Sequence, residues 1–250
     1  MSVLKDKVAI VTGAGGGFGE GIAREYVNQG ASVIVADINM PAAERVAHEL
    51  GEQARAFRVD VSKGDQVNAL AQFCQDTFGS IDIVVNNAAI THKNQPMLDV
   101  DEETFDRLLA INVKSIYLMT QATLPAMRAQ GKGVILNIGS TAAIRPRPGL
   151  SWYNATKGFV NNLSKSMAVE LGPENIRVNV ICPVMGVTGL FELFMGQPDT
   201  PENRQKFMST IPMGRFCTPA DVAAAAVFLA SDAAAFFTGV ELPVDGGRTI

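Results

Sequence analysis

Short apolar runs rich in β-branched residues alternate with helical patterns along the 250-residue chain. The first run, at residues 7–12, is almost continuously apolar, which is typical of a strand buried on both faces of a parallel sheet. Similar runs lie at 32–36, 54–59, 81–85, 133–138 and 176–181, with a weaker one at 240–244. Apolar residues spaced three and four apart predict helices over 18–29, 41–50, 65–78, 102–128, 152–171 and 219–230. The alternation predicts an α/β fold with a doubly wound parallel sheet of about seven strands and helices on both faces, as a single domain over residues 1–250.

One segment departs from this rhythm. Between 182 and 218 the sequence carries four prolines and four glycines among apolar side chains such as Phe191, Phe194 and Phe207. We expect a substrate lid or insertion around 184–217, because loops on a rigid scaffold commonly carry binding function. A surface loop covered by a partner protein is the alternative interpretation.

Charge and hydropathy exclude several classes of partner. The net charge is -4, the isoelectric point is about 5.3 and the basic residues are scattered, so neither nucleic acid nor an anionic membrane surface is expected. The longest apolar stretch, 222–230, is far shorter than the ~20 residues of a membrane-spanning helix. Residues 1–6 lack the apolar core of a signal peptide. The sequence therefore predicts a cytoplasmic protein that does not contact membranes.

The cysteines and histidines give no metal or disulfide pattern. Cys74, Cys182 and Cys217 are widely spaced without a C-x-x-C pair, and the only histidines are His48 and His92. We expect buried, reduced thiols and no bound metal.

A glycine-rich turn directly follows the first predicted strand and opens the first predicted helix. Glycines allow a tight turn and let the backbone approach a pyrophosphate, whose charge the N–H groups of a helix N-terminus stabilise. The position at a strand-to-helix junction separates a dinucleotide fingerprint from a chance glycine string. The residues expected to bind the cofactor here are Gly13, Gly15, Gly16, Gly17, Phe18 and Gly19.

Asp37 ends the second predicted strand, eighteen residues after Gly19. A carboxylate at this position can accept hydrogen bonds from the adenosine ribose hydroxyls, and it repels a 2′-phosphate. The neighbouring Ile38 supplies no positive charge for such a phosphate. The sequence therefore predicts NAD as the cofactor in preference to NADP, with a plain helix cap as the alternative role for Asp37.

Three further residues indicate acid–base chemistry. Tyr153 and Lys157 lie four residues apart in a predicted helix, and Ser140 lies thirteen residues before Tyr153. Positions i and i+4 share a helix face, so the phenol and the ammonium can face one small ligand. A nearby cation favours the phenolate, and a serine hydroxyl can hold the substrate oxygen. The set suits proton transfer to an alcohol or a carbonyl, although the Tyr–Lys spacing alone is also common on exposed helices.

Together these motifs resemble the short-chain dehydrogenase/reductase family in its standard-length form, and the resemblance covers the whole chain. The motifs are T-G-x-x-x-G-x-G at 12–19, N-N-A-A at 86–89, and the set of Ser140, Tyr153 and Lys157. The resemblance implies a Rossmann-type fold, an NAD-dependent oxidoreductase acting on CH–OH groups, and a homotetramer or dimer.

The resemblance also implies roles for single residues. Tyr153 would be the general acid–base, Lys157 would lower its pKa and bind the nicotinamide ribose, and Ser140 would orient the substrate. Asn112 would keep a water in a proton relay with the lysine. Further cofactor contacts would come from Asp60, Val61, Asn86, Asn87, Ala88, Ala89, Pro183 and Thr188.

Two residues depart from the family pattern. Ala89 stands where a glycine is common after N-N-A, which adds a methyl group beside the cofactor. Val184 stands where a glycine usually follows Pro183. Because valine disfavours positive φ, this departure bears on the local turn and on the placement of Thr188.

The favoured function is interconversion of a secondary alcohol and a ketone, with a small molecule as substrate. The alternatives are a 3-oxoacyl-carrier-protein reductase using NADPH and a nucleotide-binding protein without catalysis. Arg145 and Arg147, between the serine and the tyrosine, could hold a substrate carboxylate, although isolated arginines are usually solvated surface groups. His92 could touch the substrate or serve the structure.

Overall fold

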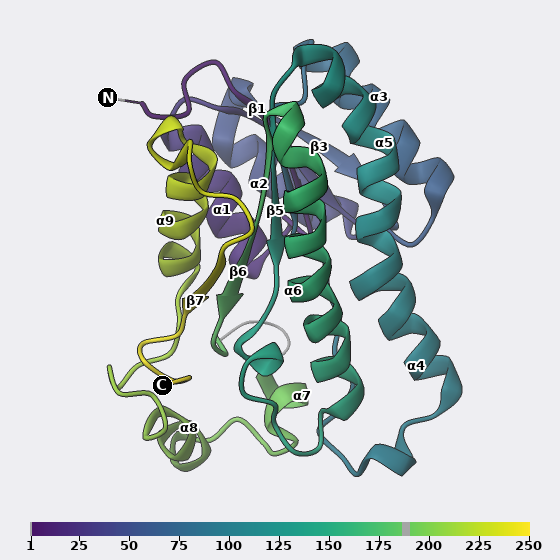
Figure 1. The fold of residues 1–250 in the computed structure, drawn as a ribbon. Helices are drawn as coiled ribbons and strands as arrows, with labels where there is room; N and C mark the ends of the chain where they lie inside the picture. The colour runs from purple at the N-terminus through teal and green to yellow at the C-terminus, as the bar shows by residue number, and fades with distance from the viewer. Residues whose placement is uncertain (1, 187–190) are drawn as a thin grey trace.

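Seven strands form one sheet in the computed structural model, which describes residues 2–186 and 191–250 (Figure 1). The order across the sheet is β3-β2-β1-β4-β5-β6-β7, and every neighbouring pair is parallel. The strands are β1 (Val8–Thr12), β2 (Ser32–Asp37), β3 (Ala54–Arg58), β4 (Ile83–Asn86), β5 (Gly133–Ile138), β6 (Ile176–Pro183) and β7 (Glu241–Val244). The predicted doubly wound parallel sheet is confirmed.

The chain reverses direction across the sheet between β3 and β4. It moves outward from β1 to β2 and β3, and then returns to place β4 on the other side of β1, where Ile10 pairs with Val84. In open α/β sheets, ligands bind outside the carboxyl ends of the strands at such a reversal. The loops that follow β1 and β4 are therefore the place to look for a site.

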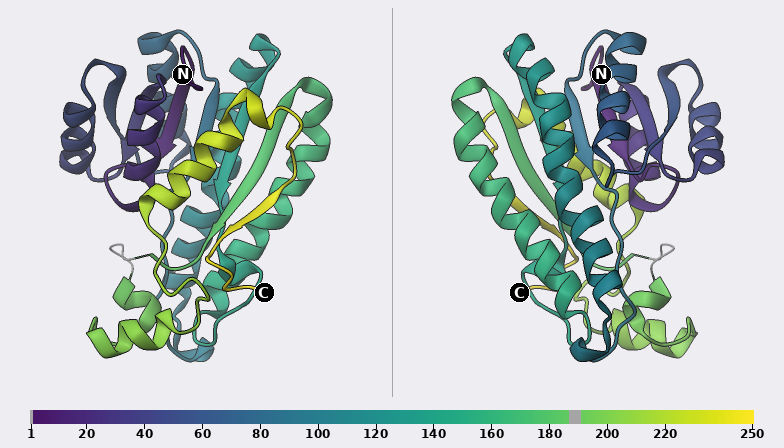
Figure 2. Two further views of the ribbon diagram at one scale, coloured as in Figure 1. Left: turned by 90° about the vertical axis from the view of Figure 1, so that its left-hand side faces the viewer. Right: turned by 90° about the vertical axis from the view of Figure 1, so that its right-hand side faces the viewer.

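Helices cover both faces of the sheet (Figure 2). Neighbouring strand residues point to opposite faces, so Val11 packs with α1, α2 and α9, whereas Ile10 packs with α3, α5 and α6. Among the described residues, no helix has both the length and the apolar character that crossing a bilayer requires. The helices are α1 (Gly17–Asn28), α2 (Met40–Leu50), α3 (Gly64–Phe78), α4 (Glu102–Leu109), α5 (Ser115–Gln130), α6 (Ser151–Leu171), α7 (Phe191–Met195), α8 (Pro201–Met208) and α9 (Pro219–Ala230).

The helix predicted over 102–128 is wrong as one continuous α-helix. The structure divides it into α4, a five-residue π-helix at Ala110–Lys114, and α5. Asn112 lies in the π-helix with its side chain buried, and its amide bonds to the backbone of Ile90 on the loop after β4. A wider turn of this kind re-aims a side chain without ending the helix, and the periodicity of apolar residues does not reveal it.

Two strand boundaries differ from the prediction by two residues, and the other strand boundaries differ by no more than one. β4 begins at Ile83, because the N–H of Ile81 donates to the side chain of Gln130 at 3.1 Å. β6 continues to Pro183, because β7 pairs with its last residues, up to Pro183 opposite Val244. The longer β6 carries Pro183 to the edge of the sheet where the carboxyl ends of the strands meet.

The turn after β1 lies directly against the start of α1. Gly13 has φ of +64°, a conformation that side chains rarely adopt, and a Cβ added there would lie 2.9 Å from the Cα of Ala88. Gly19 sits one helical turn into α1, where an added Cβ would fall 2.5 Å from Asn87 Nδ2 and closer still to the carbonyl oxygen of Gly13. Because Gly13 and Gly19 have no side chains, the turn after β1, the start of α1 and the loop after β4 can lie against one another.

We expect Gly19→Ala to lower the free energy of unfolding by ~1–3 kcal/mol, because the added methyl group must displace the Gly13 carbonyl or the Asn87 amide. Gly16→Ala is the matched control, since an added Cβ meets no heavy atom within 4 Å and the backbone is extended. It should change stability by less than ~1 kcal/mol. Urea unfolding followed by circular dichroism measures both, and equal losses would contradict this account of the turn.

Candidate active site

A cavity of about 600 Å³ opens at the carboxyl ends of the strands. It runs from the end of β2, past the loops after β1 and β4, to the first turns of α6. The sequence-predicted residues that line it are Gly13, Gly16, Gly17, Phe18, Asp37, Ile38, Asp60, Val61, Asn87, Ala88, Ala89, Ser140, Tyr153, Lys157 and Pro183. One surface thus carries both the predicted nucleotide residues and the predicted acid–base residues.

Four of the predicted cofactor-binding and catalytic residues do not line the cavity. Gly15, Gly19 and Asn112 stand behind its wall, and Asn86 turns its side chain away from it, donating to Asn137 Oδ1 at 2.8 Å. The cofactor wall that the resemblance assigns partly to Asn86 is therefore formed by the residues after it. Thr188 lies outside the described residues.

Asn87 fixes the glycine turn to the loop after β4. Its side-chain nitrogen donates to the carbonyl oxygens of Thr12 at 2.8 Å and Gly13 at 3.1 Å. In return, Thr12 Oγ1 accepts the N–H groups of Asn87 at 3.0 Å and Ala88 at 3.1 Å. These four bonds satisfy the polar groups on the protein side of the turn, and the N-terminus of α1 remains directed at the cavity.

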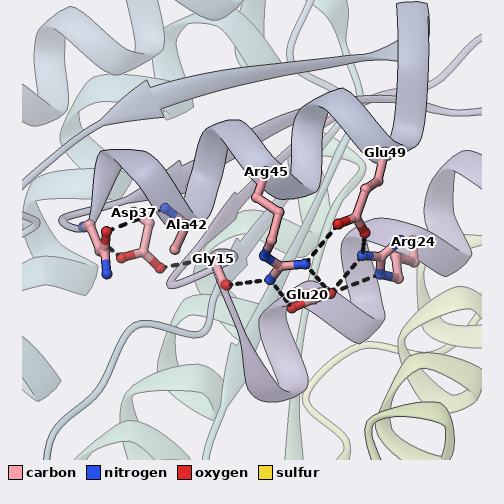
Figure 3. A network of polar contacts seen from close by, with 8 residues as sticks. Gly15, Glu20, Arg24, Asp37, Ala42, Arg45 and Glu49 are labelled. Atoms are coloured by element: carbon pink, nitrogen blue, oxygen red, sulfur yellow. Dashed lines mark hydrogen bonds and ion pairs between the residues drawn. The ribbon is translucent and has the colours of Figure 1, made fainter.

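Asp37 is held at the end of β2 by two backbone donors. Its Oδ2 accepts the N–H of Gly15 and its Oδ1 accepts the N–H of Asn39, each at 2.9 Å (Figure 3). The carboxylate also lines the cavity, so it bridges the glycine turn and the ligand space. The capping role weighed for Asp37 belongs to Asn39, whose side chain accepts from Ala42 at the start of α2.

Beside this turn lies an ion-pair network that the sequence analysis missed (Figure 3). Arg45 donates to Gly15 O at 3.2 Å, to Glu20 Oε2 at 2.8 Å and to Glu49 Oε1 at 3.2 Å. Arg24 also binds both glutamates. The hydrogen bond from Arg45 is the largest cause that holds the pKa of Glu20 below its usual value, with burial opposing it. Arg45 and Glu49 are four residues apart on α2, a detectable spacing, but only the fold brings Glu20 to them.

Asp60 is positioned by the loop after β3. Its Oδ1 accepts both the N–H of Ser62 at 2.9 Å and its hydroxyl at 2.7 Å. Burial acts to raise the pKa of Asp60, but these bonds and the charge of Lys63 outweigh it and the pKa falls below its usual value. An ionised carboxylate therefore lines the cavity next to Val61.

Tyr153 and Lys157 are buried on one face of α6 and both line the cavity. The amine of Lys157 donates to Ile138 O, at the end of β5, at 2.7 Å and lies 5.9 Å from the centre of the Tyr153 ring. Burial raises the pKa of Tyr153 to about 12, and a hydrogen bond with Ser140 opposes the shift. Burial also lowers the pKa of Lys157 to about 8. Lys157 is not among the causes of the Tyr153 shift, so the lowering of the tyrosine pKa by the lysine, which the resemblance implies, stays a prediction.

Ser140 follows β5 at the rim of the same cavity. Its Oγ accepts the N–H of Ala142 at 3.1 Å, which caps a short 3₁₀ turn at Thr141–Ala143. The preceding Gly139 packs so closely that an added Cβ would lie 2.5 Å from Asn161 Oδ1 and 2.8 Å from Val180 Cγ2. The serine hydroxyl is therefore set by the packing of β5 against α6 and β6.

The amide of Asn112 is occupied by protein groups. It donates to Ile90 O at 2.9 Å and to Thr156 Oγ1 at 3.1 Å, and its oxygen accepts the N–H of Ile90 at 2.9 Å. Thr156 in turn donates to Tyr153 O at 2.8 Å. The side chain thus connects the loop after β4 to α6.

The two departures from the family pattern fit the backbone. Ala89 lines the cavity. Val184 is buried, its N–H donates to Val244 O at 3.1 Å, and it is not among the non-glycine residues with positive φ in the described chain. The extension of the β6–β7 ladder therefore replaces the turn that a glycine would make.

Part of the segment around 184–217 covers the acid–base end of the cavity. Met185, Phe194 and Phe207 line the cavity, and Phe194 meets the Tyr153 ring edge-on with centroids 5.0 Å apart. α7 and α8 lie beyond the carboxyl ends of the strands in both views of Figure 2. The apolar residues of this segment therefore pack towards the site.

Three arginines line the acid–base end of the cavity, one more than the two that the sequence analysis offered as ligands of a substrate carboxylate. Arg145 and Arg147 line the cavity as that hypothesis requires, and so does Arg248, which it missed because no motif surrounds it near the end of the chain. His92 is buried outside the cavity lining, with Nδ1 2.7 Å from Lys93 O. Its buried Nε2 has no hydrogen-bond partner among the described residues, so a structural role for His92 stays a prediction.

Comparison with known proteins agrees with this geometry. A family model described as enoyl-(acyl carrier protein) reductase matches residues 13–249. The chain is 47% identical over 250 residues to 4-formylbenzenesulfonate dehydrogenase of Comamonas testosteroni, covering 99% of each. It is 39% identical over 247 residues to 7alpha-hydroxysteroid dehydrogenase of Escherichia coli strain K12, covering 98% of this chain and 94% of the relative.

Solved structures give the same result. A 3-ketoacyl-(acyl-carrier-protein) reductase from Brucella melitensis complexed with NADH superposes with a TM-score of 0.94 at 47% identity, covering 99% of this chain and 100% of that one. An NAD⁺-bound xylitol dehydrogenase superposes with a TM-score of 0.92 at 31% identity, covering 98% and 99%. Family model, relatives and fold agree, and the chain belongs to the short-chain dehydrogenase/reductase family.

Proposed function

We propose that the protein is an NAD(H)-dependent oxidoreductase that interconverts a secondary alcohol and a ketone, with Tyr153 as the general acid–base. The observation that carries this proposal is the single cavity, which places Asp37 and the glycine turn at one end and Ser140, Tyr153 and Lys157 at the other. The named relatives act on substrates as different as a formylbenzenesulfonate and a hydroxysteroid, so their names support the reaction type and not one substrate.

The residues present fit a dinucleotide. The helix N-terminus of α1, the glycine turn and the carboxylate of Asp37 are the groups that the pyrophosphate and the adenosine ribose need. The predicted contacts of Phe18, Ile38, Asp60, Val61, Ala88, Ala89 and Pro183 are supported by their place in the cavity lining. NAD(H), when bound, supplies or accepts the hydride.

The chain's own residues would move the proton. In alcohol oxidation Tyr153 takes the hydroxyl proton as a phenolate, and in reduction it returns the proton as a phenol. Ser140 holds the same substrate oxygen, and Lys157 binds the nicotinamide ribose while its bond to Ile138 O fixes its direction. Since the side chain of Asn112 is occupied, its part in a proton relay would fall to its main-chain carbonyl, which lies within the π-helix.

The charges around Asp37 favour NAD(H) over NADP(H). A 2′-phosphate would approach the carboxylate of Asp37, and the nearby Arg45 is already paired with Glu20 and Glu49. A 3-oxoacyl-carrier-protein reductase is the second candidate, because one solved neighbour carries a name of that kind and was complexed with NADH. Asp37 counts against the NADPH-dependent form of that candidate. Intact Ser140, Tyr153 and Lys157 count against a non-catalytic nucleotide-binding protein.

We further propose that residues 184–217, with Thr188 near the nicotinamide, act as a substrate lid, and that the protein works in the cytoplasm. The lid is supported by the packing of Phe194 on Tyr153. The location is supported by three buried cysteines that form no disulfide, as expected in a reducing compartment.

We also propose a homotetramer, with a dimer as the lesser assembly. Two groups of exposed apolar side chains support it: Tyr117, Phe159 and Val169 on α5 and α6, and Phe236 with Phe237 after α9. Exposed patches of this kind on a soluble enzyme commonly mark subunit interfaces.

Tyr153→Phe removes only the titrating hydroxyl. We expect kcat for alcohol oxidation to fall by ~10²–10⁴-fold, the range of general acid–base catalysis, while NADH binding stays within about twofold. Tyr117→Phe on the exposed face of α5 is the control and should keep full activity. NADH absorbance follows turnover and NADH fluorescence follows binding. Turnover by Tyr153→Phe at the wild-type rate would end the proposed mechanism.

Asp37→Asn removes one negative charge and retains an oxygen for the Gly15 N–H. We expect wild-type protein to prefer NADH, and the variant to raise kcat/KM with NADPH relative to NADH by at least ~10-fold, which corresponds to ~1.4 kcal/mol. Glu44→Gln, the same change of charge on exposed α2, is the control and should leave the ratio unaltered. A wild-type preference for NADPH would instead favour the second candidate.

The homotetramer predicts that light scattering after size exclusion gives four times the 26.6 kDa chain mass. Val169→Glu places a charge in the α5–α6 patch and should reduce the mass to that of a dimer, because an unpaired charge in an interface is costly. Leu98→Glu is the control at an exposed leucine outside both patches. A monomer at micromolar concentration would refute the assembly.

A further inference from the structure

Three arginines line the end of the cavity that lies furthest from Asp37. Arg145 and Arg147 come from the loop between β5 and α6, and Arg248 comes from the turn after β7. Asp37 ends β2, which lies on the opposite half of the sheet. A cofactor whose ribose binds Asp37 therefore does not account for these three cations.

Two of the guanidinium groups pack against one aromatic ring. The Cζ of Arg147 lies 4.9 Å and that of Arg248 lies 5.9 Å from the centre of the Phe207 ring. Phe207 is buried on α8 and lines the cavity with them. Stacking on a ring holds a guanidinium plane in a fixed orientation and leaves its N–H edge available for a ligand.

No carboxylate in the described chain lies within 4 Å of these arginines, whereas Arg24, Arg45, Arg128, Arg204 and Arg215 form ion pairs. Arg177 is also partly buried without an ion pair, but it donates to the carbonyl oxygens of Leu229, Ser231 and Phe237. Residues 187–190 contain no acid. Asp245 is the nearest acid in sequence to Arg248, but its oxygens accept hydrogen bonds from Gly247 and Thr249. Asp245 acts on Arg248 only through its charge, so the three arginines have no ion-pair partner among the described residues.

This arrangement is unfavourable for the protein alone. Burial lowers the pKa of the Arg147 guanidinium, and the charge of Arg248 lowers it further. The contact that Arg147 makes to a side chain is a weak one, from Nη1 to the sulfur of Met185 at 3.9 Å. Arg147 is partly buried, and a charge that is largely removed from water is normally paired, so the lack of a carboxylate beside it among the described residues points to a partner that arrives from outside.

The backbone fixes these arginines relative to the acid–base residues. The carbonyl oxygen of Arg147 accepts a hydrogen bond of 2.8 Å from the side chain of Asn154, the residue after Tyr153. The Nη1 of Arg145 donates to the carbonyl oxygen of Arg248 at 2.9 Å, which ties the turn after β7 to the loop before α6. The walls between are apolar, with Leu150 and Phe194 packed against Tyr153.

We propose that the substrate carries an oxyanion head group, a carboxylate or a sulfonate, which Arg147 and Arg248 bind across the Phe207 ring while its apolar body reaches Tyr153. This inference rests on the proposed function for the reacting end and on the arginine cluster for the head group. Arg145 acts as a positioning residue through its bond to Arg248. Both anions present two or more coplanar or equivalent oxygens that match the fork of a guanidinium.

Three alcohols that share one reacting group test the proposal with NAD⁺: α-methylbenzyl alcohol bearing a para carboxylate, a para sulfonate or a para methyl group. We expect wild-type kcat/KM to be at least ~10-fold higher for one or both anions than for the methyl compound, as expected for a charge-assisted bidentate contact. The two anionic arms identify which head group the site prefers. Equal kcat/KM for all three alcohols would overturn the proposal.

Arg147→Met and Arg248→Met separate charge recognition from packing. Each should lose most of the preference for the anions, chiefly through KM, and change the methyl compound by less than about threefold. Arg204→Met is the matched control, because Arg204 also stacks on a phenylalanine, Phe191 at 5.3 Å, but is paired with Asp199 and lies outside the cavity lining. An equal loss of kcat/KM for all three alcohols would mean that the arginines only hold α8 in place through Phe207, and would refute anion binding.

Calorimetry with para-toluenesulfonate and para-toluate on the NAD⁺-loaded protein keeps the two proposals apart. If wild-type protein binds the anions and Arg147→Met and Arg248→Met do not, the anion site is upheld. If the wild-type protein then turns over none of the alcohols, the proposed reaction is refuted and the anion site still stands. Turnover of the methyl compound without binding of either anion would refute the anion site and leave the reaction standing.

Discussion

The site depends on the direct approach of the turn after β1 to the loop after β4. Thr12 and Asn87 exchange hydrogen bonds across this junction, and Gly13 and Gly19 leave no side chain to hold the segments apart. The polar groups on the inner side of the turn are thereby satisfied by protein. Those at the N-terminus of α1 face the cavity, so ligand binding is built into the place where the sheet order reverses.

Burial is the largest cause of the pKa shifts at the reacting end. Tyr153 is shifted towards its neutral phenol and Lys157 towards its neutral amine, because both lie in an enclosed, largely apolar wall. A group that brings charge into the cavity therefore changes the protonation of both residues together. The same reasoning applies to Arg147, whose burial lowers its pKa. Among the described residues, the charge of Arg147 has no ion-pair partner at this end of the cavity.

Local patterns predicted the fold and much of the site, and contacts between distant segments account for what they missed. The apolar runs and the glycine turn are contiguous in sequence, so the parallel sheet and the position of the turn could be predicted from them, whereas the order of the strands comes from the structure. The π-helix follows from the bonds between Asn112 and Ile90, which are twenty-two residues apart. Arg248 and Phe207 meet Arg147 only after the sheet and α8 are in place, and no spacing in the sequence encodes that meeting.

The five-residue π-helix between α4 and α5 amounts to one residue inserted into an α-helix. Each residue of an α-helix advances the chain by about 100° around the axis, so the insertion rotates every position after it by roughly that angle. Leu108 before it and Ile116 after it, eight residues apart, are both buried. Deleting one residue between them would restore a regular α-helix and remove the wider turn that holds Asn112 against Ile90. Chain length here is thus as constrained as side-chain identity, and an alignment gap in this stretch would signal a different wall behind the cavity.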